Sequence, residues 1–585
     1  MRQRQFLQIV DRDEAERRWL DALGELRDLG KDVLAIGRAL GRVLAEDVVS
    51  ELDVPGFDRA NMDGWALRAT DTYGASEQKP LRLRRAAGEV TIGTLPSTAL
   101  GPGEAMAIPT GGALPRGADA VLQVESTELD GHHVVIKRAV TPGTAISHAG
   151  TDIARGEVIL RRGALITSRE IGVLAALGRA DVAVRRRPRV GVLSTGDELV
   201  APGQQRAPGR VHDANGALVS AAVREHGGEP VTLGIVGDDA DELKGAMRKA
   251  IASLDMVILS GGTSKGPGDL AAAALADVLD PPGIVVHGVA LKPGKPLCLG
   301  ASGDTAVVVL PGFPTSAIFT FQELVAPLLR RWSGLGESTT NTVEATLPFR
   351  VRSDPGRREY RLVHLVTDER GERLAYPINK GSGSVTAWSH ADGYFVIPRH
   401  TEHVPEQSRV TIHAMSGRTP HQDELVIIGS HCPGLEIVIS ALREQRISTK
   451  VIAVGSEAGL LAAKRGACDV APIHLLDPAT NEYNRPFVDD SLELVEGYGR
   501  LQGLVFRHGD GHFATPDVAR AVECAVAAEL TMINRNRGSG TRALYDRLLG
   551  DARPPGFTAE ASSHVAVAAA IAQGRADWGI AIRNV

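Results

Sequence analysis

The stretch Met256-Val257-Ile258-Leu259-Ser260-Gly261-Gly262-Thr263-Ser264-Lys265-Gly266-Pro267-Gly268-Asp269 decides the fold class of this 585-residue chain. An apolar run ends in glycines and hydroxyls, and a helical pattern follows. Glycine lets the backbone approach a ligand, and a helix start presents free N–H groups to an anion. A second run, 307–310, passes in the same way into Pro311-Gly312-Phe313-Pro314-Thr315-Ser316. Since Lys292 and Lys295 lie between the two runs, the sequence predicts a site for a phosphorylated ligand.

The runs around this stretch alternate between strand and helix patterns. Strands are expected at 190–194, 231–236 and 256–260, with helices at 216–226 and 240–253. This alternation predicts a doubly wound parallel sheet through about residue 331.

The flanking segments are different. Short alternating runs at 81–85, 105–108, 120–125 and 134–138 predict a β-rich unit, and 340–414 predicts another small one, barrel-like. Amphipathic helices are expected at 13–29 and 35–47. We expect four domains: a helical linker part plus a β-rich part at 1–185, an α/β domain at 186–332, a small β domain at 338–415, and a second α/β unit at 424–585. Strands of this last unit are expected at 425–429, 450–455 and 530–534.

Bulk composition excludes several classes. Hydrophobic residues make up 43% of the chain and charged residues 23%, which is typical of a globular protein, and a net charge of −6 gives no reason to expect nucleic acid or an acidic membrane as partner. The four cysteines form no C-x-x-C pair, which argues against structural zinc or a disulfide framework. With no apolar leader and no 18-residue apolar run, we expect a cytoplasmic protein without membrane spans.

Loops that follow parallel strands meet at one edge of the sheet, where ligands bind. Those loops carry Ser194-Thr195-Gly196-Asp197-Glu198, Gly237-Asp238-Asp239, the segment 262–269, and 311–316. Carboxylates beside a phosphate site repel the ligand unless a hard cation such as Mg²⁺ lies between them. Each acid taken alone is read first as a helix cap, whereas the four loops together indicate function. No G-x-G-x-x-G follows a strand and no G-x-x-x-x-G-K-[ST] occurs, so dinucleotide and nucleoside-triphosphate sites are disfavoured.

The chain resembles the molybdopterin molybdenumtransferase family (MoeA, gephyrin E-domain-like) over residues 5–414. The motifs that carry the resemblance occur in family order: Asp53-Val54-Pro55-Gly56-Phe57-Asp58 with Asn61-Met62-Asp63-Gly64-Trp65-Ala66, Pro109-Thr110-Gly111-Gly112, Gly150-Thr151-Asp152-Ile153, Ser194-Thr195-Gly196-Asp197-Glu198-Leu199, Asp213-Ala214-Asn215, the segment 260–269, Lys292-Pro293-Gly294-Lys295-Pro296 and Pro311-Gly312-Phe313-Pro314. Two departures stand out: Phe313 where asparagine is usual, and Lys265 where an apolar or small residue is usual.

The resemblance implies that molybdate is ligated to the dithiolene of adenylylated molybdopterin with release of AMP, assisted by Mg²⁺. It implies a homodimer in which the N-terminal domain of one subunit helps to close the site of the other, and, as further partners, apo-molybdoenzymes or the molybdopterin adenylyltransferase. Carried over residue by residue, the catalytic set is Asp63, Thr110, Asp152, Glu198, Asp238 and Asp269, of which Glu198, Asp238 and Asp269 are the expected metal ligands. The expected substrate-binding set is Ser194, Gly196, Asp197, Gly261, Gly262, Thr263, Ser264, Lys265, Lys292, Lys295, Pro311, Gly312 and Pro314.

Residues 424–585 resemble the type-II periplasmic-binding-protein-like domain, which implies an oxyanion or small-ligand sensor or delivery module. Hydroxyls at helix starts and one arginine are its candidate ligand residues: Ser430, Arg537, Ser539 and Thr541. Arg535 and Arg542 are expected to be solvated around the turn. Because a two-lobed domain normally returns to its first lobe, the end at Val585 indicates either a trimmed module or an incomplete sequence.

Two alternatives stay open at this stage. One is a non-catalytic scaffold built on the same fold, and the other is a ligand-responsive regulator dominated by the C-terminal unit. Neither the preference between molybdate and tungstate nor the ligand of the C-terminal unit follows from the sequence.

Overall fold

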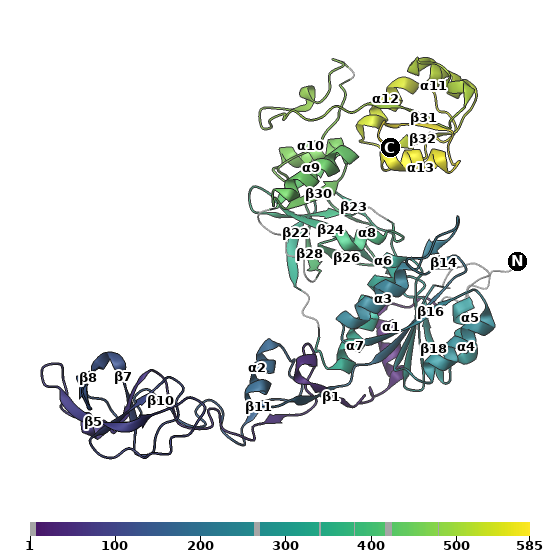
Figure 1. The fold of residues 1–585 in the computed structure, drawn as a ribbon. Helices are drawn as coiled ribbons and strands as arrows, with labels where there is room; N and C mark the ends of the chain where they lie inside the picture. Colours follow the sequence, from purple (N-terminus) through teal and green to yellow (C-terminus); the bar gives the residue numbers. More distant parts are fainter. Residues whose placement is uncertain (1–7, 262–269, 338–340, 379–380, 416–423, 478) are drawn as a thin grey trace.

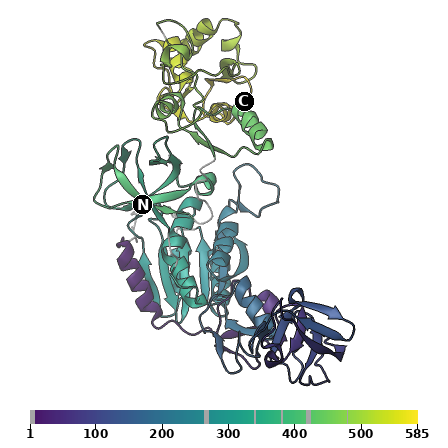
Figure 2. The ribbon, with the colours of Figure 1, turned by 90° about the vertical axis from the view of Figure 1, so that its left-hand side faces the viewer.

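The computed structural model describes residues 8–261, 270–337, 341–378, 381–415, 424–477 and 479–585. Figures 1 and 2 show an elongated molecule with a β-rich unit at one end, an α/β unit in the middle, and a small β unit that carries the C-terminal module. In the described residues, no helix combines the length and apolar character that crossing a bilayer requires.

The central unit is a six-stranded sheet in the order β16-β13-β17-β21-β20-β18. Its strands are β13 (Arg189–Thr195), β16 (Glu229–Val236), β17 (Met256–Ser260), β18 (Pro282–His287), β20 (Cys298–Ser302) and β21 (Thr305–Leu310). The four strands from β16 to β21 are parallel, as predicted, whereas β20 and β18 extend the sheet antiparallel. An apolar run in the sequence does not show whether a strand pairs parallel or antiparallel, so the sequence did not reveal the direction of these two strands.

Helices cover both faces of this sheet. They are α3 (Ala214–Glu225), α4 (Ala240–Ile251), α5 (Leu270–Val278), α6 (Pro314–Thr320) and α7 (Ala326–Ser333). Met256 and Ile258 of β17 face one hydrophobic core, and Val257 and Leu259 face the other. Successive side chains of a strand point to opposite faces of the sheet, and both faces of β17 are buried. The apolar run in the sequence is therefore continuous.

The first helix, α1 (Arg12–Leu23), belongs to this core although it lies far from it in the sequence. Trp19 is almost fully buried and donates from Nε1 to the Gly300 carbonyl oxygen at 2.9 Å.

The helix expected at 35–47 does not form. Residues Lys31–Ala35 are instead strand β1, paired antiparallel with β12 (Asp181–Arg185), and a 3-10 turn follows at Ile36–Arg38. Gly37 and Gly41 interrupt the helical pattern, and Val33 and Leu34 suit a pleated strand.

The N-terminal β-rich unit contains a six-stranded sheet in the order β7-β4-β6-β5-β9-β8. Its strands are β4 (Gly64–Leu67), β5 (Leu81–Glu89), β6 (Glu104–Ile108), β7 (Ala120–Gln123), β8 (Thr127–Asp130) and β9 (His133–Ile136). The pair β3 (Arg59–Ala60) and β10 (Ile146–Ser147) lies beside it. The linker toward the central unit holds β2 (Val48–Val49), β11 (Val158–Leu160) and α2 (Ser168–Ala176), which begins with a Thr167/Glu170 capping box.

The small β unit closes into a ring of five strands. They are β22 (Thr342–Thr346), β24 (Arg358–Thr367), β25 (Arg373–Pro377), β26 (Gly393–Ile397) and β28 (Arg409–Ala414), and the pairing runs β24-β25-β22-β28-β26 and back to β24. The short strand β19 (Leu291–Lys292) comes from the central unit and pairs parallel with β24. The lysine turn is thereby attached to the barrel.

The C-terminal module begins with β29 (Leu425–Gly429), α9 (Pro433–Glu444), β30 (Thr449–Ala453) and α10 (Ser456–Lys464). A second sheet in the order β31-β34-β32-β33 follows, made of β31 (Gln502–Phe506), β32 (Met532–Arg535), β33 (Glu560–Ala561) and β34 (Trp578–Ile582), with α11 (Val518–Ala527), α12 (Gly540–Leu549) and α13 (His564–Ala572). The first sheet packs on the barrel, where Ile428 and Ile452 share a buried cluster with Val366, Leu374 and Tyr376.

Candidate functional site

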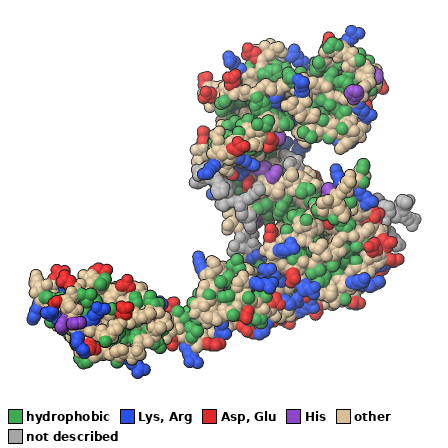
Figure 3. All heavy atoms as spheres, in the orientation of Figure 1, with side chains coloured by type: hydrophobic (Ala, Val, Ile, Leu, Met, Phe, Trp, Pro, Cys, Tyr) green, Lys and Arg blue, Asp and Glu red, His purple; other side chains and the backbone are tan. Residues whose placement is uncertain are grey.

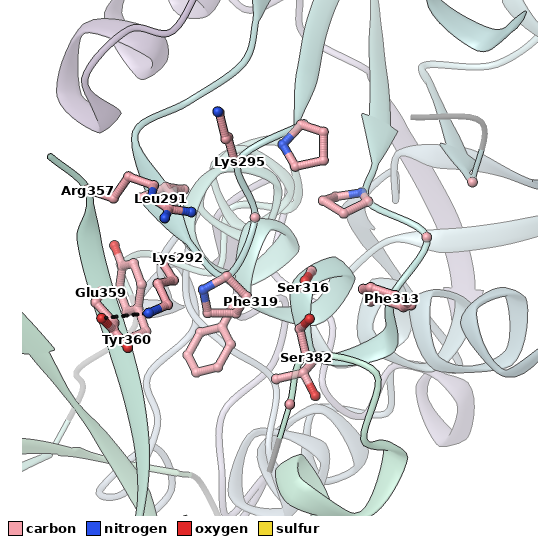
Figure 4. Close-up of a pocket in the computed structure, with 18 of the residues that line it drawn as sticks. Leu291, Lys292, Lys295, Phe313, Ser316, Phe319, Arg357, Glu359, Tyr360 and Ser382 are labelled. Carbon is pink, nitrogen blue, oxygen red and sulfur yellow. Dashed lines mark ion pairs between the residues drawn. The ribbon is translucent and has the colours of Figure 1, made fainter. Parts of the chain in front are cut away.

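A cavity of about 910 Å³ lies between the carboxyl edge of the central sheet and the barrel. Its lining comes from both units: Thr195, Gly196, Glu198, Asp238, Gly261, Lys292, Lys295, Pro311, Gly312, Phe313, Thr315 and Ser316 from the first, and Arg357, Glu359, Tyr360, Arg361, Leu362 and Ser382 from the second. Figure 4 shows Lys292, Arg357 and Glu359 on one side, with Phe313, Ser316 and Ser382 on the other. The cavity is therefore the meeting point that the strand-end argument predicted.

One wall of the cavity is acidic. Glu198 follows β13 and Asp238 follows β16, so both carboxylates arise from neighbouring parallel strands. Asp197 does not line the cavity in the described structure. Its Oδ1 accepts a hydrogen bond from the Asp238 backbone N–H at 3.1 Å and joins the two loops.

Glycines let these loops approach each other. Gly261 has φ +105, and a Cβ added there would lie 2.4 Å from the Thr195 carbonyl oxygen. A side chain at that position would push the β13 and β17 loops apart, so glycine is required.

Another part of the lining is cationic, and a buried carboxylate holds it in place. Glu359 is 2% exposed, and its Oε2 lies 3.3 Å from Lys292 Nζ and accepts from Ser353 Oγ at 2.7 Å. Its Oε1 lies 2.6 Å from Arg361 Nε. Lys292 Nζ is also 2.7 Å from Asp354 Oδ2, and this contact lowers the pKa of Asp354. Glu359 thus orients two cations at the edge of the cavity.

A buried polar group supports the floor. Asn215 Nδ2 donates to Ser260 Oγ at 2.9 Å and to the Gly312 carbonyl oxygen at 2.8 Å. Ser194 lies in this layer and does not line the cavity, and its Oγ is buried without a partner in the described structure. Pro314 is the first residue of α6, outside the described lining. Thr315 Oγ1 donates to the Ser384 carbonyl oxygen at 2.8 Å, which ties the start of α6 to the barrel.

Asp63, Thr110 and Asp152 lie elsewhere in the single chain. Asp63 Oδ1 accepts from the Thr110 backbone N–H at 2.7 Å and from its Oγ1 at 2.8 Å, and these bonds lower the pKa of Asp63. All three residues are exposed on the β-rich unit, which Figure 3 shows joined to the rest of the molecule by a narrow connection. In the described chain they do not line the cavity.

Five predicted site residues, Gly262, Thr263, Ser264, Lys265 and Asp269, lie outside the described residues. Within the described ranges, no group of three or more histidine, cysteine, aspartate or glutamate residues is arranged to hold a metal. Glu198 and Asp238 nevertheless fit Mg²⁺, which takes one or two carboxylates and completes its shell with ligand oxygens and water.

The barrel side of the cavity was not predicted from the sequence. Arg357, Glu359, Arg361 and Ser382 come from a segment whose short strands gave only a fold class. The available signal was charged residues in a strand that is otherwise apolar, as in Arg358-Glu359-Tyr360-Arg361.

In the C-terminal module, Ser539 and Thr541 lie at the start of α12, and Ser430 follows β29. Ser539 caps the helix by accepting from the Arg542 backbone N–H, and Thr541 Oγ1 accepts from Gln502 Nε2 at 3.0 Å. Arg537 is exposed. The expectation that Arg535 and Arg542 are solvated is wrong, since they are 7% and 8% exposed. Arg542 is held by Asp546 and Glu560, each at 3.0 Å.

Family models match nearly the whole chain. They are the MoeA N-terminal region (domain I and II) at 10–178, a probable molybdopterin binding domain at 191–331, the MoeA C-terminal region (domain IV) at 344–414, and a PBP superfamily domain at 439–585.

Individual proteins that are similar to this chain carry the name of the same family. Molybdopterin molybdenumtransferase 2 of Mycobacterium tuberculosis (strain ATCC 25618 / H37Rv) is 36% identical over 327 residues, covering 55% of this chain and 80% of the relative. Molybdopterin molybdenumtransferase of Bacillus subtilis (strain 168) is 33% identical over 380 residues, covering 63% and 86%. The crystal structure of the molybdopterin biosynthesis MoeA protein from Pyrococcus horikosii aligns with a TM-score of 0.60 at 37% identity, covering 70% of this chain and all of that one.

The fold and the cavity define a class of multidomain proteins in which a molybdopterin-binding-like α/β domain shares its ligand cavity with a small barrel. Within that class, the chain belongs to the molybdopterin molybdenumtransferase family and carries a PBP-like module at its C-terminal end. The predicted fold class and family are confirmed.

Proposed function

We propose that this chain inserts molybdate into adenylylated molybdopterin with release of AMP, as a transferase of molybdenum cofactor biosynthesis. The observation that carries the proposal is the cavity itself, which is lined by Glu198 and Asp238 from the strand ends together with Lys292, Lys295 and the barrel arginines. A ligand with phosphate groups fits the cationic wall, and a metal fits between it and the acids. The family's named relatives support the same activity.

The roles of the side chains follow from their chemistry. Lys292, Lys295, Arg357 and Arg361 would bind phosphate or molybdate oxygens, since they are the cations of the cavity. Glu359 keeps Lys292 and Arg361 in place and is therefore a positioning residue. The backbone of Gly196, Gly261 and Gly312 would approach the ligand closely.

We also propose Mg²⁺ as the assisting metal. Glu198 and Asp238 would hold it, together with the predicted ligand Asp269. Bound there, Mg²⁺ would neutralise phosphate charge and help AMP to leave.

We propose a homodimer, because Asp63, Thr110 and Asp152 lie on a unit that extends away from the cavity of its own chain (Figure 1). A partner's β-rich unit would deliver them to the cavity. The domain bounds 1–185, 186–332, 338–415 and 424–585 are part of this proposal, with α1 packed on the second domain. We also propose that the protein is cytoplasmic and that its C-terminal module is an oxyanion sensor or delivery module.

AMP release from adenylylated molybdopterin, with molybdate and Mg²⁺ and the full-length protein, tests the function. Lys292→Ala should lower kcat/KM at least tenfold, because it removes a cation of the cavity. Lys249→Ala, an exposed lysine on α4, is the matched control and should leave the rate unchanged. If the folded, dimeric wild-type protein releases no AMP, the proposed transferase activity is wrong, and the non-catalytic scaffold is the hypothesis that remains.

A further inference from the structure

Three helices of the C-terminal module begin around one histidine, His474. Ser456, the first residue of α10, has its Oγ 3.1 Å from His474 Nδ1. Gly540, the first residue of α12, is in such close contact that an added Cβ would clash with the His474 carbonyl oxygen. His564, the first residue of α13, has its ring centroid 6.5 Å from that of His474. Three positive helix ends therefore meet, and the α12 approach requires glycine.

A buried cation lies beside them without a counter-charge. Arg535, at the end of β32, is 7% exposed, and its Nε donates to the Ala561 carbonyl oxygen at 3.0 Å. Its Nη2 lies 3.4 Å from the Ser562 carbonyl oxygen, next to the start of α13. Its Nη1 is buried and has no hydrogen-bond partner among the described residues. No carboxylate of the described chain pairs with it, and leaving such a charge buried and unpaired is costly.

The two histidines are also unsatisfied. His474 Nε2 and His564 Nδ1 are buried without partners in the described structure. Ser456 Oγ accepts from the His474 backbone N–H at 3.2 Å and lies 3.1 Å from His474 Nδ1, to which its hydroxyl proton can be donated. That arrangement satisfies both groups and leaves the proton of the neutral ring on Nε2, as an unused donor.

The charged groups that lower the pKa of the two histidines are all cations. Burial, together with Arg500 and Arg535, lowers the pKa of His474 and of His564 to about 3, so both rings are neutral at pH 7. Glu457, in the first turn of α10, is exposed beside Gly538. Arg535 Nη1 and His474 Nε2 are thus unused donors in a positive potential, which suits an anion and disfavours a cation.

We propose that Arg535, His474 and His564 form a binding site for a small inorganic oxyanion at the junction of α10, α12 and α13. The Nη1 group of Arg535 would supply the charge, and the imidazoles and the helix ends would supply the remaining hydrogen bonds. This inference rests on the proposed oxyanion-sensor role and deepens it by naming the residues that bind the ligand, with Arg535 in place of Arg537. It does not depend on the transferase activity.

Isothermal titration of the full-length protein with sodium molybdate, tungstate, sulfate and phosphate tests the site, with sodium chloride as the ionic-strength control. We expect saturable binding of at least one oxyanion, weakened at least tenfold in Arg535→Gln. Arg537→Gln is the matched control, an exposed arginine two residues away, and should bind like the wild type. If thermal unfolding shows that Arg535→Gln is not folded, His564→Gln is titrated in its place and should show the same loss.

Two controls separate this site from the transferase cavity. Lys292→Ala should retain the binding, and AMP release is measured on the same preparations. Binding without AMP release would remove the proposed transferase function and keep the oxyanion site. The site is overturned if folded protein binds none of the four anions, if Arg537→Gln rather than Arg535→Gln loses binding, or if only Lys292→Ala loses it.

Discussion

Glu359 is the residue on which the cationic wall of the cavity depends. It is buried and contacts Lys292, Arg361 and Ser353, whereas Asp354, which also contacts Lys292, is exposed. Glu359→Gln would remove the carboxylate that pairs with Arg361 and would leave Lys292 with the exposed Asp354 as its partner, and breaking a buried pair costs about 3–5 kcal/mol. We expect kcat/KM for AMP release to fall at least tenfold, with a lower Tm.

Asp354→Asn provides the comparison, since exposed ion pairs contribute about 0–1 kcal/mol. It should change the rate less than threefold. Equal losses in the two variants would show that burial of Glu359 is not what positions Lys292.

The histidines of the C-terminal module predict an acid-sensitive stability. Folding lowers the pKa of His474 and His564 from the ordinary 6.5 to about 3. Between these values the unfolded chain binds more protons than the folded one, so stability falls as the pH falls from 6.5 toward 3. At pH 5 the loss is about 2 kcal/mol for each histidine.

Thermal unfolding at pH 7 and pH 5 measures this effect. The drop in Tm should be smaller in His564→Gln than in the wild type, because one of the two protonation sites is gone. His508→Gln, an exposed histidine of the same module, should show the wild-type drop. An identical drop in all three proteins would mean that other groups carry the acid sensitivity.

Single residues were predictable where a motif fixed them. The cavity is lined by four such residues, Glu198, Asp238, Lys292 and Lys295. They were predictable because the strand-end loops and the lysine turn have recognisable spacing. Arg361 and Glu359 were not predictable, since only the pairing of β19 with β24 brings their strand to the lysine turn. The burial of Arg535 was not predicted, because local sequence cannot tell which of two neighbouring arginines turns inward.

At the scale of elements, strongly periodic segments were predicted correctly. The strands at 190–194 and 256–260 and the helices at 216–226 and 240–253 all form. Prediction was wrong at 35–47, where Ala35 is the last residue of β1 and pairs with Asp181, 146 positions away in the sequence. Such a long-range pairing overrides a weak helical pattern.

The contact of β30 with the barrel predicts how the C-terminal module is held. Lys450 Nζ lies 2.6 Å from Asp392 Oδ2 and donates to the Leu365 carbonyl oxygen, with side chains only 11% and 9% exposed. Lys450→Ala would remove the lysine that pairs with the buried Asp392 carboxylate, which would keep the Leu365 backbone N–H at 2.8 Å and the His364 ring at 3.9 Å, and breaking a buried pair costs about 3–5 kcal/mol. We expect the module to loosen, with faster proteolysis between the barrel and the module.

Lys464→Ala is the matched control, because Lys464 pairs with Asp489 at a more exposed position on α10. Its proteolysis rate should equal that of the wild type. If Lys450→Ala is cleaved no faster, the apolar cluster of Ile428 and Ile452 alone holds the interface.

At the scale of the whole molecule, the separation of Asp63 from the cavity makes the proposed homodimer testable by mixing. Asp63→Asn and Glu198→Gln proteins should each be inactive, because every site in either dimer lacks one carboxylate. In a mixed dimer, one site combines the intact Glu198 of one chain with the intact Asp63 of the other, and the second site carries both changes. Random mixing makes half of the dimers mixed, and half of their sites are intact, so about one quarter of wild-type activity should return.

The measurement is AMP release after the two variants are co-expressed with different affinity tags and purified on both tags in succession. The doubly purified dimers should reach about half of wild-type activity, since all of them are mixed. Co-expressing Glu198→Gln with a double Asp63→Asn, Glu198→Gln chain is the control and should restore nothing, because no site then has an intact Glu198. Activity that stays at zero in the doubly purified Asp63→Asn and Glu198→Gln dimer would mean that both carboxylates must come from one chain, which the extended position of the β-rich unit argues against.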